Sequence, residues 1–545
     1  MSPWRDPLVA SALLAVQAAP ALAAEQFRVQ VERRGARVPM KARAIGLAAA
    51  LAGAALAGCA ALERPLDAHL ASEVFGVREC AQWFETLDQA IDAARVRDVQ
   101  DTRVEGFPYL RVNRLLASMR AQAMTSFEQR AYVERLRALD IEARGFEIAN
   151  LPRALFDTLP DLYPEAERSV AVRRSAECGH LLARIDLDRP QALAKILARA
   201  RVPDDYSTAH RVLGLYALTR VLFASGVRRW QGEVRERFRG ALTEPTRMPL
   251  VRYAPVGGST LYYQTVAGYL GRAVFEPFGI LELSERELER VFAAYAPSFE
   301  IEVGGDFDRF GRLRWERESA VPTVDASALE VYTNVSHTRY GEHVLLQLVY
   351  TIWFPQRPPA YEGDILAGRL DGLTWRVTLA PDGEPLIYDA IHPCGCFHMF
   401  FPTARARPRP APDSLEEWAF VPQTLPRVQP GERPRVRLAS GTHYIERVSL
   451  VRGADSLVRY QIQPYNALRS MWDMRGGKRS AFGPRGLIAG SERPERFLFW
   501  PMGIESAGAM RQWGRHATAF VGRRHFDDAD LFERRFELEL DRPRR

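Results

Sequence analysis

The spacing of the apolar residues changes at Phe299, and this change constrains the fold more than any other feature of the chain. Over residues 75–245 apolar side chains recur every three or four positions, which predicts amphipathic helices. After Phe299 apolar and polar residues alternate in short runs that end at turn residues, which predicts antiparallel hairpins. We therefore expect an α+β fold. In this fold a helical domain (59–250) and a helical connecting segment (251–298) precede a mostly antiparallel, β-rich domain (299–545).

Local signals in the sequence support this division. Thr125 followed by Glu128, and Ser284 followed by Glu287, match the capping box that begins helices. Short Gly-containing turns between alternating runs are typical of β-hairpins. The predicted hairpins pair residues 329–339 with 343–354, 374–379 with 384–391, and 442–451 with 456–464.

Residues 40–58 have the features of an export signal. Lys41 and Arg43 precede an apolar run that is too short to span a bilayer comfortably. The run ends in Leu-Ala-Gly-Cys59, which resembles the lipobox of bacterial lipoproteins. The resemblance implies cleavage of the signal peptide before Cys59 and lipidation of its thiol. Because Ala60 and not Asp follows, it also implies sorting to the outer membrane, facing the periplasm. The alternative is an Ala-rich buried helix that ends by chance in a cysteine.

A second apolar run, from Leu8 to Ala24, precedes this signal. A chain does not need two export signals in series. We therefore expect Met40 to be the true start of the protein, and residues 1–39 to be a disordered product of an over-extended gene assignment.

The charge of the chain argues against a nucleic-acid partner. The formal charge is +7, from 74 Lys and Arg and 67 Asp and Glu. Residues 1–58 hold seven of the cations and three of the acids, so the remainder, with 67 cations and 64 acids, carries only +3. Nucleic-acid binding normally needs a concentrated basic face. No later apolar run reaches the length of a membrane span. We therefore expect attachment to the membrane through the lipid anchor, with an envelope protein, a glycan or a lipid as partner.

Residues 392–398 gather two imidazoles and two thiols, those of His392, Cys394, Cys396 and His398. On a strand these four side chains share one face, but the first and the last lie roughly 20 Å apart. One metal ion could therefore bind all four only if the chain bends at Pro393 or at the following glycine. Zn and Cu ions both accept such ligands.

Three interpretations of this stretch remain open. It is a Zn or Cu site, completed by His443 or His337. Alternatively, Cys394 and Cys396 form a disulfide or a redox pair, which an exported protein permits. In the third interpretation the residues are buried and structural. Asp389, which precedes the stretch, is a candidate acid or base partner for its histidines.

Two further sets of residues are candidates for a defined role. Cys80 and Cys178 both fall in the helical part, and in an exported chain with Cys59 lipidated they are a candidate disulfide. His337 and His343 flank a predicted hairpin turn. They are candidates to face one pocket, with Glu342 as an acid or base partner, although exposed turn histidines are commoner.

The C-terminal part holds a basic stretch with aromatic residues between the cations. Its cations would suit an anionic lipid head group, a glycan or a phosphate. The alternative is a solvated face whose cations pair with Asp527, Asp528 and Asp530. The candidate anion-binding residues are Arg511, Arg515, His516, Arg523 and Arg524.

Three stretches are similar to uncharacterised lipoproteins of proteobacteria. They are Gly-Phe-Pro-Tyr-Leu-Arg-Val at 106–112, the stretch around Cys394 and Cys396, and Arg-Gln-Trp-Gly-Arg-His at 511–516. This resemblance brings no catalytic residues with it. Two functional hypotheses follow. The first is a lipid-anchored envelope protein that acts by binding or assembly through its β-rich domain. The second is a periplasm-facing metal-dependent or thiol-redox enzyme centred on residues 392–398.

Overall fold

The computed structural model describes residues 65–160, 167–240, 248–257, 260–317, 319, 321–453 and 458–540. The predicted signal peptide, the lipidation site Cys59 and residues 1–39 lie outside the described residues. Contacts divide the chain after Glu79 into two compact units. The described part of the first unit holds helix α3 (Pro65–Leu70) and the start of α4 (Val77–Ala94). The following description concerns the second unit.

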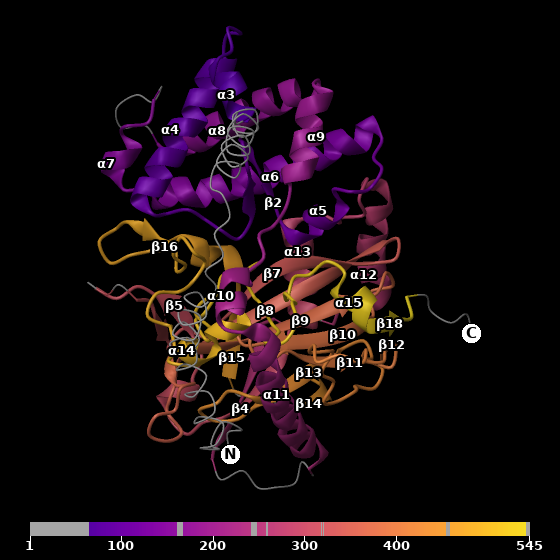
Figure 1. Ribbon diagram of the computed structural model, residues 1–545. Coiled ribbons are helices and arrows are strands. Elements are labelled where there is room, and N and C mark those ends of the chain that lie inside the picture. The colour runs from indigo at the N-terminus through magenta and orange to yellow at the C-terminus, as the bar shows by residue number, and fades with distance from the viewer. Residues whose placement is uncertain are drawn as a thin grey trace, which may run out of the picture. The chain divides into compact units, whose positions relative to one another are not determined.

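Helices dominate the second unit up to residue 240, as the apolar spacing predicts (Figure 1). Both predicted capping boxes are confirmed: Thr125 begins α6 and Ser284 begins α13, and each is reciprocally hydrogen-bonded to the Glu three positions later. The helices after α4 are α5 (Arg114–Met119), α6 (Ser126–Asn150), α7 (Arg153–Phe156), α8 (Arg168–Leu187), α9 (Pro190–Arg199), α10 (Thr208–Leu213), α11 (Tyr216–Arg239), α12 (Tyr263–Leu270), α13 (Glu285–Tyr295), α14 (Arg496–Phe499) and α15 (Leu531–Arg535), with short 3₁₀ turns η1 (Gly271–Phe275), η2 (Asp306–Asp308), η3 (Tyr465–Arg469) and η4 (Trp500–Met502).

Ten of the described strands form one large sheet, which runs in the order β11-β10-β9-β8-β7-β15-β3-β4-β13-β14 (Figure 1). Its strands are β3 (Leu250–Pro255), β4 (Ser298–Glu302), β7 (Glu330–Tyr340), β8 (His343–Arg357), β9 (Gly368–Leu379), β10 (Pro385–Ile391), β11 (Met399–Pro402), β13 (Glu432–Leu438), β14 (Ile445–Arg452) and β15 (Val458–Pro464). The other described strands form two-stranded pairs: β1 (Thr102–Val104) with β2 (Phe107–Val112), β5 (Arg312–Arg314) with β6 (Thr323–Asp325), β12 (Ala406–Pro408) with β18 (Phe536–Leu538), and β16 (Met471–Trp472) with β17 (Lys478–Arg479).

Two of the three predicted hairpins are confirmed. Strands β7 and β8 pair antiparallel up to Tyr340 and His343, and the left-handed Gly341 lies in the turn between them. Strands β9 and β10 form the second hairpin around Gly383, which also has a positive φ. Both turns are short, so the sequence between the strands is enough to set their pairing.

The third predicted hairpin is wrong. Strand β14 pairs antiparallel with β13 at the edge of the large sheet, whereas β15 pairs parallel with both β3 and β7. Three strands separate β14 from β15 in the sheet order. The alternation of residues 456–464 indicated a strand correctly, but alternation carries no information about which distant strand will be the neighbour.

The α+β class is confirmed, whereas the finer description is met only in part. Three adjacent strand pairs in the large sheet are parallel, namely β15 with β3, β15 with β7, and β13 with β4, so the sheet is mixed. The helical part also contains the hairpin of β1 and β2, which packs against α6 and α8. Strand β3, from the predicted helical connection, joins the middle of the large sheet.

Both faces of strands β8 to β10 are covered. Leu348, Tyr350 and Trp375 on one face join a core that includes residues of α11, α12 and α13. The opposite face carries polar side chains such as Gln347 and Arg376, which are nevertheless buried. Arg376 donates to the carbonyl of Phe526 at 2.5 Å, because the C-terminal segment covers this face. Apolar and polar residues therefore alternate in these strands although neither face is exposed to solvent.

The candidate disulfide between Cys80 and Cys178 is formed, with its sulfurs 2.06 Å apart. It joins α4 to α8, two helices that lie 98 residues apart in the sequence. In the described part of the chain, no helix combines the length and the apolar character that crossing a membrane would require.

Candidate functional site

Residues 392–398 form a tight bend between β10 and β11. The backbone N–H of Gly395 donates to the carbonyl of His392 at 2.7 Å, and that of His392 donates to the carbonyl of Cys396 at 3.0 Å. Gly395 has a φ of +92°, and a Cβ at this position would lie 2.3 Å from the carbonyl oxygen of Ala517. Glycine is therefore required both by the backbone conformation and by the close approach of the C-terminal segment.

His392 belongs to a buried cluster centred on Asp371. Oδ1 of Asp371 lies 3.1 Å from Nδ1 of His392 and 3.2 Å from the guanidinium of Arg493, and Oδ2 lies 2.8 Å from Nδ1 of His443. Nε2 of His443 in turn lies 3.3 Å from Asp308. Burial alone would raise the pKa of Asp371, but His392 and Arg493 outweigh it and hold this pKa well below its ordinary value. The cluster is thus a set of charge-assisted hydrogen bonds.

His398 belongs to a different cluster. Its Nε2 lies 2.9 Å from Asp389, which also accepts two hydrogen bonds from Arg376 at 2.9 and 2.6 Å. The Arg376 guanidinium lies 3.8 Å from the ring centre of Phe526. Burial lowers the pKa of His398 to about 3, so this imidazole is neutral at physiological pH. Asp389 is therefore the hydrogen-bond partner of His398, whereas His392 pairs with Asp371.

Cys394 and Cys396 are free thiols that lie next to each other. The backbone N–H of Cys396 donates to the sulfur of Cys394 at 3.4 Å. Burial would raise the pKa of Cys394, but hydrogen bonds from Cys396 and the charge of Arg493 lower it below its ordinary value. The side-chain hydrogen bond to Cys394, together with burial, raises the pKa of the Cys396 thiol well above its ordinary value. Within the described residues, no three His, Cys, Asp or Glu side chains are grouped so that they could hold a metal ion.

The histidines beside the β7–β8 turn do not share a pocket. His343 and Glu342 are exposed at the turn. His337 is half-buried, and burial together with the charge of Arg135 lowers its pKa to about 4. His337 also lies away from His392. The sheet register aligns Ile391 with Tyr332 of β7, three strands away, and His337 lies five positions further along β7. Of the two proposed additional ligands, only His443 lies near residues 392–398, and it reaches them through Asp371.

The basic C-terminal stretch is largely internal. Arg511 and Arg524 are buried and donate to backbone carbonyls, Arg511 to that of Cys394 at 3.2 Å and Arg524 to that of Thr518 at 3.0 Å. His516 is also buried, and burial lowers its pKa to about 3.

The two remaining candidates form ion pairs, but not with the predicted acids. Arg515 pairs with Asp205 at 2.8 Å and Arg523 pairs with Asp204. Asp527, one of the predicted partners, pairs instead with Arg114 at 3.2 Å. These ion pairs therefore connect the C-terminal segment to the loop that holds Asp204 and Asp205.

A cavity of about 490 Å³ lies where the helical part, α13, the large sheet and the C-terminal segment meet. Its walls come from the loop before β1, from the N-cap of α5, from α6 and α13, from β7 and β15, from η3, and from the C-terminal segment that includes Trp513 and Asp527. The wall is lined by carboxyl, amide and aromatic side chains, and aliphatic residues complete it. The carboxyls are Asp101, Glu142, Glu285, Glu289 and Asp527, the amides are Gln100, Asn113, Asn334 and Asn466, and the aromatics are Phe292, Tyr465 and Trp513.

A buried ion network holds the inner wall of the cavity in place. Arg469 donates to both oxygens of Asp98, at 2.9 and 3.0 Å, and to the wall residue Glu142 at 2.9 Å. Arg111 of β2 donates to the backbone carbonyl of Asp98 at 2.8 Å and pairs with Glu147 at 2.8 Å. Removing Arg469 would leave the buried Asp98 without a cation partner, so this wall is expected to be rigid.

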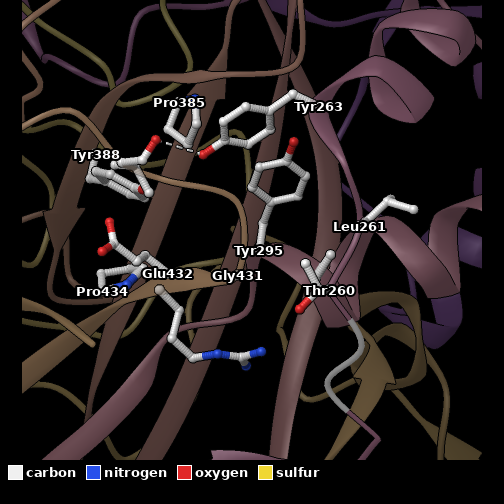
Figure 2. A pocket seen from close by; sticks show the side chains of 12 residues that line it. Thr260, Leu261, Tyr263, Tyr295, Pro385, Tyr388, Gly431, Glu432 and Pro434 are labelled. Carbon is white, nitrogen blue, oxygen red and sulfur yellow. Dashed lines mark hydrogen bonds between the residues drawn. The ribbon is translucent and has the colours of Figure 1, made fainter. Parts of the chain in front are cut away.

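A second cavity is much smaller. Tyr263, Tyr295 and Tyr388 are among the residues that line it (Figure 2). Its volume is about 20 Å³, which suits a single water molecule. Tyr263 donates to the carbonyl of Val428 at 3.0 Å and Tyr295 donates to that of Gly383 at 2.5 Å. Burial raises the pKa of all three hydroxyls, so they stay protonated. This cavity is too small for an organic ligand.

The sequence did not single out the larger cavity. Its lining residues come from segments spread between Gln100 and Asp527, and no pair of them forms a known motif. The only signal was indirect, since Trp513 and Gly514 fall inside the stretch 511–516, which is similar to other lipoproteins. No family model, curated protein or solved structure matches this chain.

Proposed function

We propose that this protein is a lipid-anchored component of the bacterial outer membrane that faces the periplasm and binds a small polar molecule in the 490 Å³ cavity. The observation that carries the proposal is the cavity itself, whose volume lies within the range of small-molecule sites. Its wall combines apolar and aromatic surface with several polar groups, which is the usual composition of such sites. The Leu-Ala-Gly-Cys sequence at Cys59 and the disulfide between Cys80 and Cys178 support export.

Two measurements test this proposal separately. Mass spectrometry of the native protein should find an acylated Cys59 at the N-terminus, and Cys59→Ser should abolish acylation and membrane fractionation. For binding, a thermal-shift screen of amines, amino acids, sugars and nucleotides should find at least one saturable stabiliser. Glu289→Trp on α13 should fill the cavity and abolish this effect.

A matched variant controls for the added tryptophan. Arg286→Trp places the same side chain on an exposed position of α13 that does not line the cavity. It should retain ligand binding. If no compound class stabilises the wild type, or if both variants behave alike, the cavity is not a binding site and the proposal is wrong.

The paired thiols support a second candidate function, that of a thiol-redox protein. Cys394 and Cys396 lie within hydrogen-bond distance and carry opposite pKa shifts, so one thiol is the better nucleophile. In this proposal a disulfide bond forms between Cys394 and Cys396. The S–S bond of a disulfide oxidant breaks, and the oxidant takes up the two electrons and two protons and becomes two thiols. Incubation with oxidised glutathione should then lower the mass of a peptide that contains both cysteines by about two hydrogens. Retention of both free thiols across a range of redox buffers would exclude this function.

A further inference from the structure

The lining of the cavity is strongly biased in charge. Five carboxyl side chains line it, and none of the described residues in its wall is a Lys, Arg or His. The chain as a whole has more cations than acids, 74 against 67. A wall of this composition creates a negative potential, which a cavity with low-dielectric walls concentrates.

Two of these carboxylates lack a cation partner. Glu285 and Glu289 lie four positions apart on α13, are exposed, and form no ion pair with any described residue. Like charges at this spacing destabilise a helix. The neighbouring Glu287, by contrast, both caps the helix and pairs with Arg272 at 2.8 Å. A bound cation would remove the repulsion between Glu285 and Glu289.

One buried residue of the cavity wall has an unpaired acceptor. Asp101 is only 5% exposed, and its Oδ2 has no hydrogen-bond partner in the described part of the chain. The side-chain oxygens of Gln100 and Asn334, which also line the cavity, are buried and unpaired in the same way. Unpaired buried acceptors cost free energy. These oxygens have almost no accessible surface, so a ligand with N–H donors would pair with them only after the side chains turn towards the cavity.

The remaining two carboxylates have partners within the protein. Glu142 accepts from Arg469 at 2.9 Å, and Asp527 accepts from Arg114 at 3.2 Å. The charge available to a ligand therefore comes from Glu285 and Glu289. Burial raises the pKa of Asp101 to about 7, so a bound cation would be needed to keep this carboxyl fully ionised at neutral pH. Asp101 and the Glu285–Glu289 pair derive from two separate elements, so a single ligand would have to extend between them.

The size and the aromatic wall select between kinds of cation. A volume of about 490 Å³ is far larger than a single metal ion needs, and the wall includes the aromatic residues Phe292, Tyr465 and Trp513. Aromatic rings attract organic cations. We infer that the ligand is an organic amine with more than one N–H donor group, such as a di- or polyamine, whose cationic groups contact Asp101 and the Glu285–Glu289 pair. This inference rests on the proposed binding function and specifies its ligand.

The test is isothermal titration calorimetry of the full mature protein with spermidine, putrescine, glucose and glutarate. Spermidine should bind saturably and less tightly at high salt, since the contacts are ionic, and glucose and glutarate should not bind. The double variant Glu285→Gln with Glu289→Gln should weaken spermidine binding by about tenfold. Glu233→Gln on α11, outside the cavity, is the matched control and should bind as the wild type does.

The outcomes separate this inference from the proposed function. Binding of glucose or glutarate, blocked by Glu289→Trp, without binding of either amine would keep the cavity as a ligand site and overturn the amine assignment. Amine binding that the double variant leaves unchanged would also overturn it, because the amines would then bind elsewhere. Absence of any ligand for the cavity would remove the proposed function as well.

Discussion

Replacing Asp371 by Asn tests whether the His392 region is held by a buried charge. Asp371 is fully buried and contacts His392, His443 and Arg493 within 3.2 Å. Asn has nearly the same shape, so the substitution removes the charge and one acceptor without opening a cavity. Breaking a buried ion pair from one side costs about 3–5 kcal/mol, because the partner charge stays buried and unpaired. Since Arg493 is only 1% exposed, we expect a loss in this range.

Urea unfolding followed by tryptophan fluorescence measures this loss. The matched control is Asp306→Asn, because Asp306 is fully exposed and its contact with Arg309 spans 3.7 Å. The control should not change the unfolding midpoint. A loss below about 1 kcal/mol for Asp371→Asn, with an unchanged denaturant slope, would refute the description of this cluster as a buried charged network.

The pH dependence of the same variant has a definite sign. The pKa of Asp371 in the folded protein lies well below the unfolded value of 3.8. Its contribution to stability is therefore fully present above the unfolded pKa and is lost as the pH falls through the folded one. Because Asp371 also helps to raise the pKa of His443, the difference between the wild type and Asp371→Asn should grow as the pH falls from 8 towards 5, and should shrink only in strong acid. A difference that disappears near neutral pH would contradict the assigned charge.

Three further substitutions test other parts of the structure by urea unfolding. Replacing Cys80 and Cys178 by Ser opens a loop with a sequence separation of 98 and should cost about 2–5 kcal/mol, and reductant should then no longer lower the midpoint. Burial raises the pKa of Asp101 to about 7, above its unfolded value of 3.8, so wild-type stability should fall between pH 4 and pH 7. Asp101→Asn should lack this fall, and its free energy of unfolding at pH 8 should exceed that of the wild type by at most about 4 kcal/mol. If the variant keeps the pH profile of the wild type, the raised pKa of Asp101 is wrong. Trp375→Ala should lose about 3–5 kcal/mol because its side chain is fully buried, and a loss below about 1 kcal/mol would contradict that placement.

Local signals predicted the parts of the fold that short segments determine. The capping box at Thr125 and the turn at Gly341 each depend on residues within a few positions, and both are present. The position of β15 depends on β3 and β7, which lie far back in the chain. Its alternating residues fit a strand anywhere in the sheet, so the sequence could not identify its neighbours.

In the candidate site, too, the sequence predicted the local features but not the partners from distant segments. The density of ligand-type residues made His392 and His398 conspicuous, and the required bend at Gly395 is present. Their partners, Asp371 and Asp389, are chosen by strand packing, which separates the two imidazoles into different clusters. The cavity draws on segments throughout the second unit, so no local pattern predicted it.

The position of β15 has a consequence for the order in which the chain can fold. In the described part of the large sheet, this strand alone joins the group β11 to β7 to the group β3 to β14. Until Val458–Pro464 has been synthesised, β7 and β3 each expose an unsatisfied backbone edge of the kind that aggregates. A chain that emerges from its N-terminus must therefore keep both edges apart until late in its synthesis. Products truncated before residue 458 should be insoluble or rapidly degraded, even though most of the strands are present.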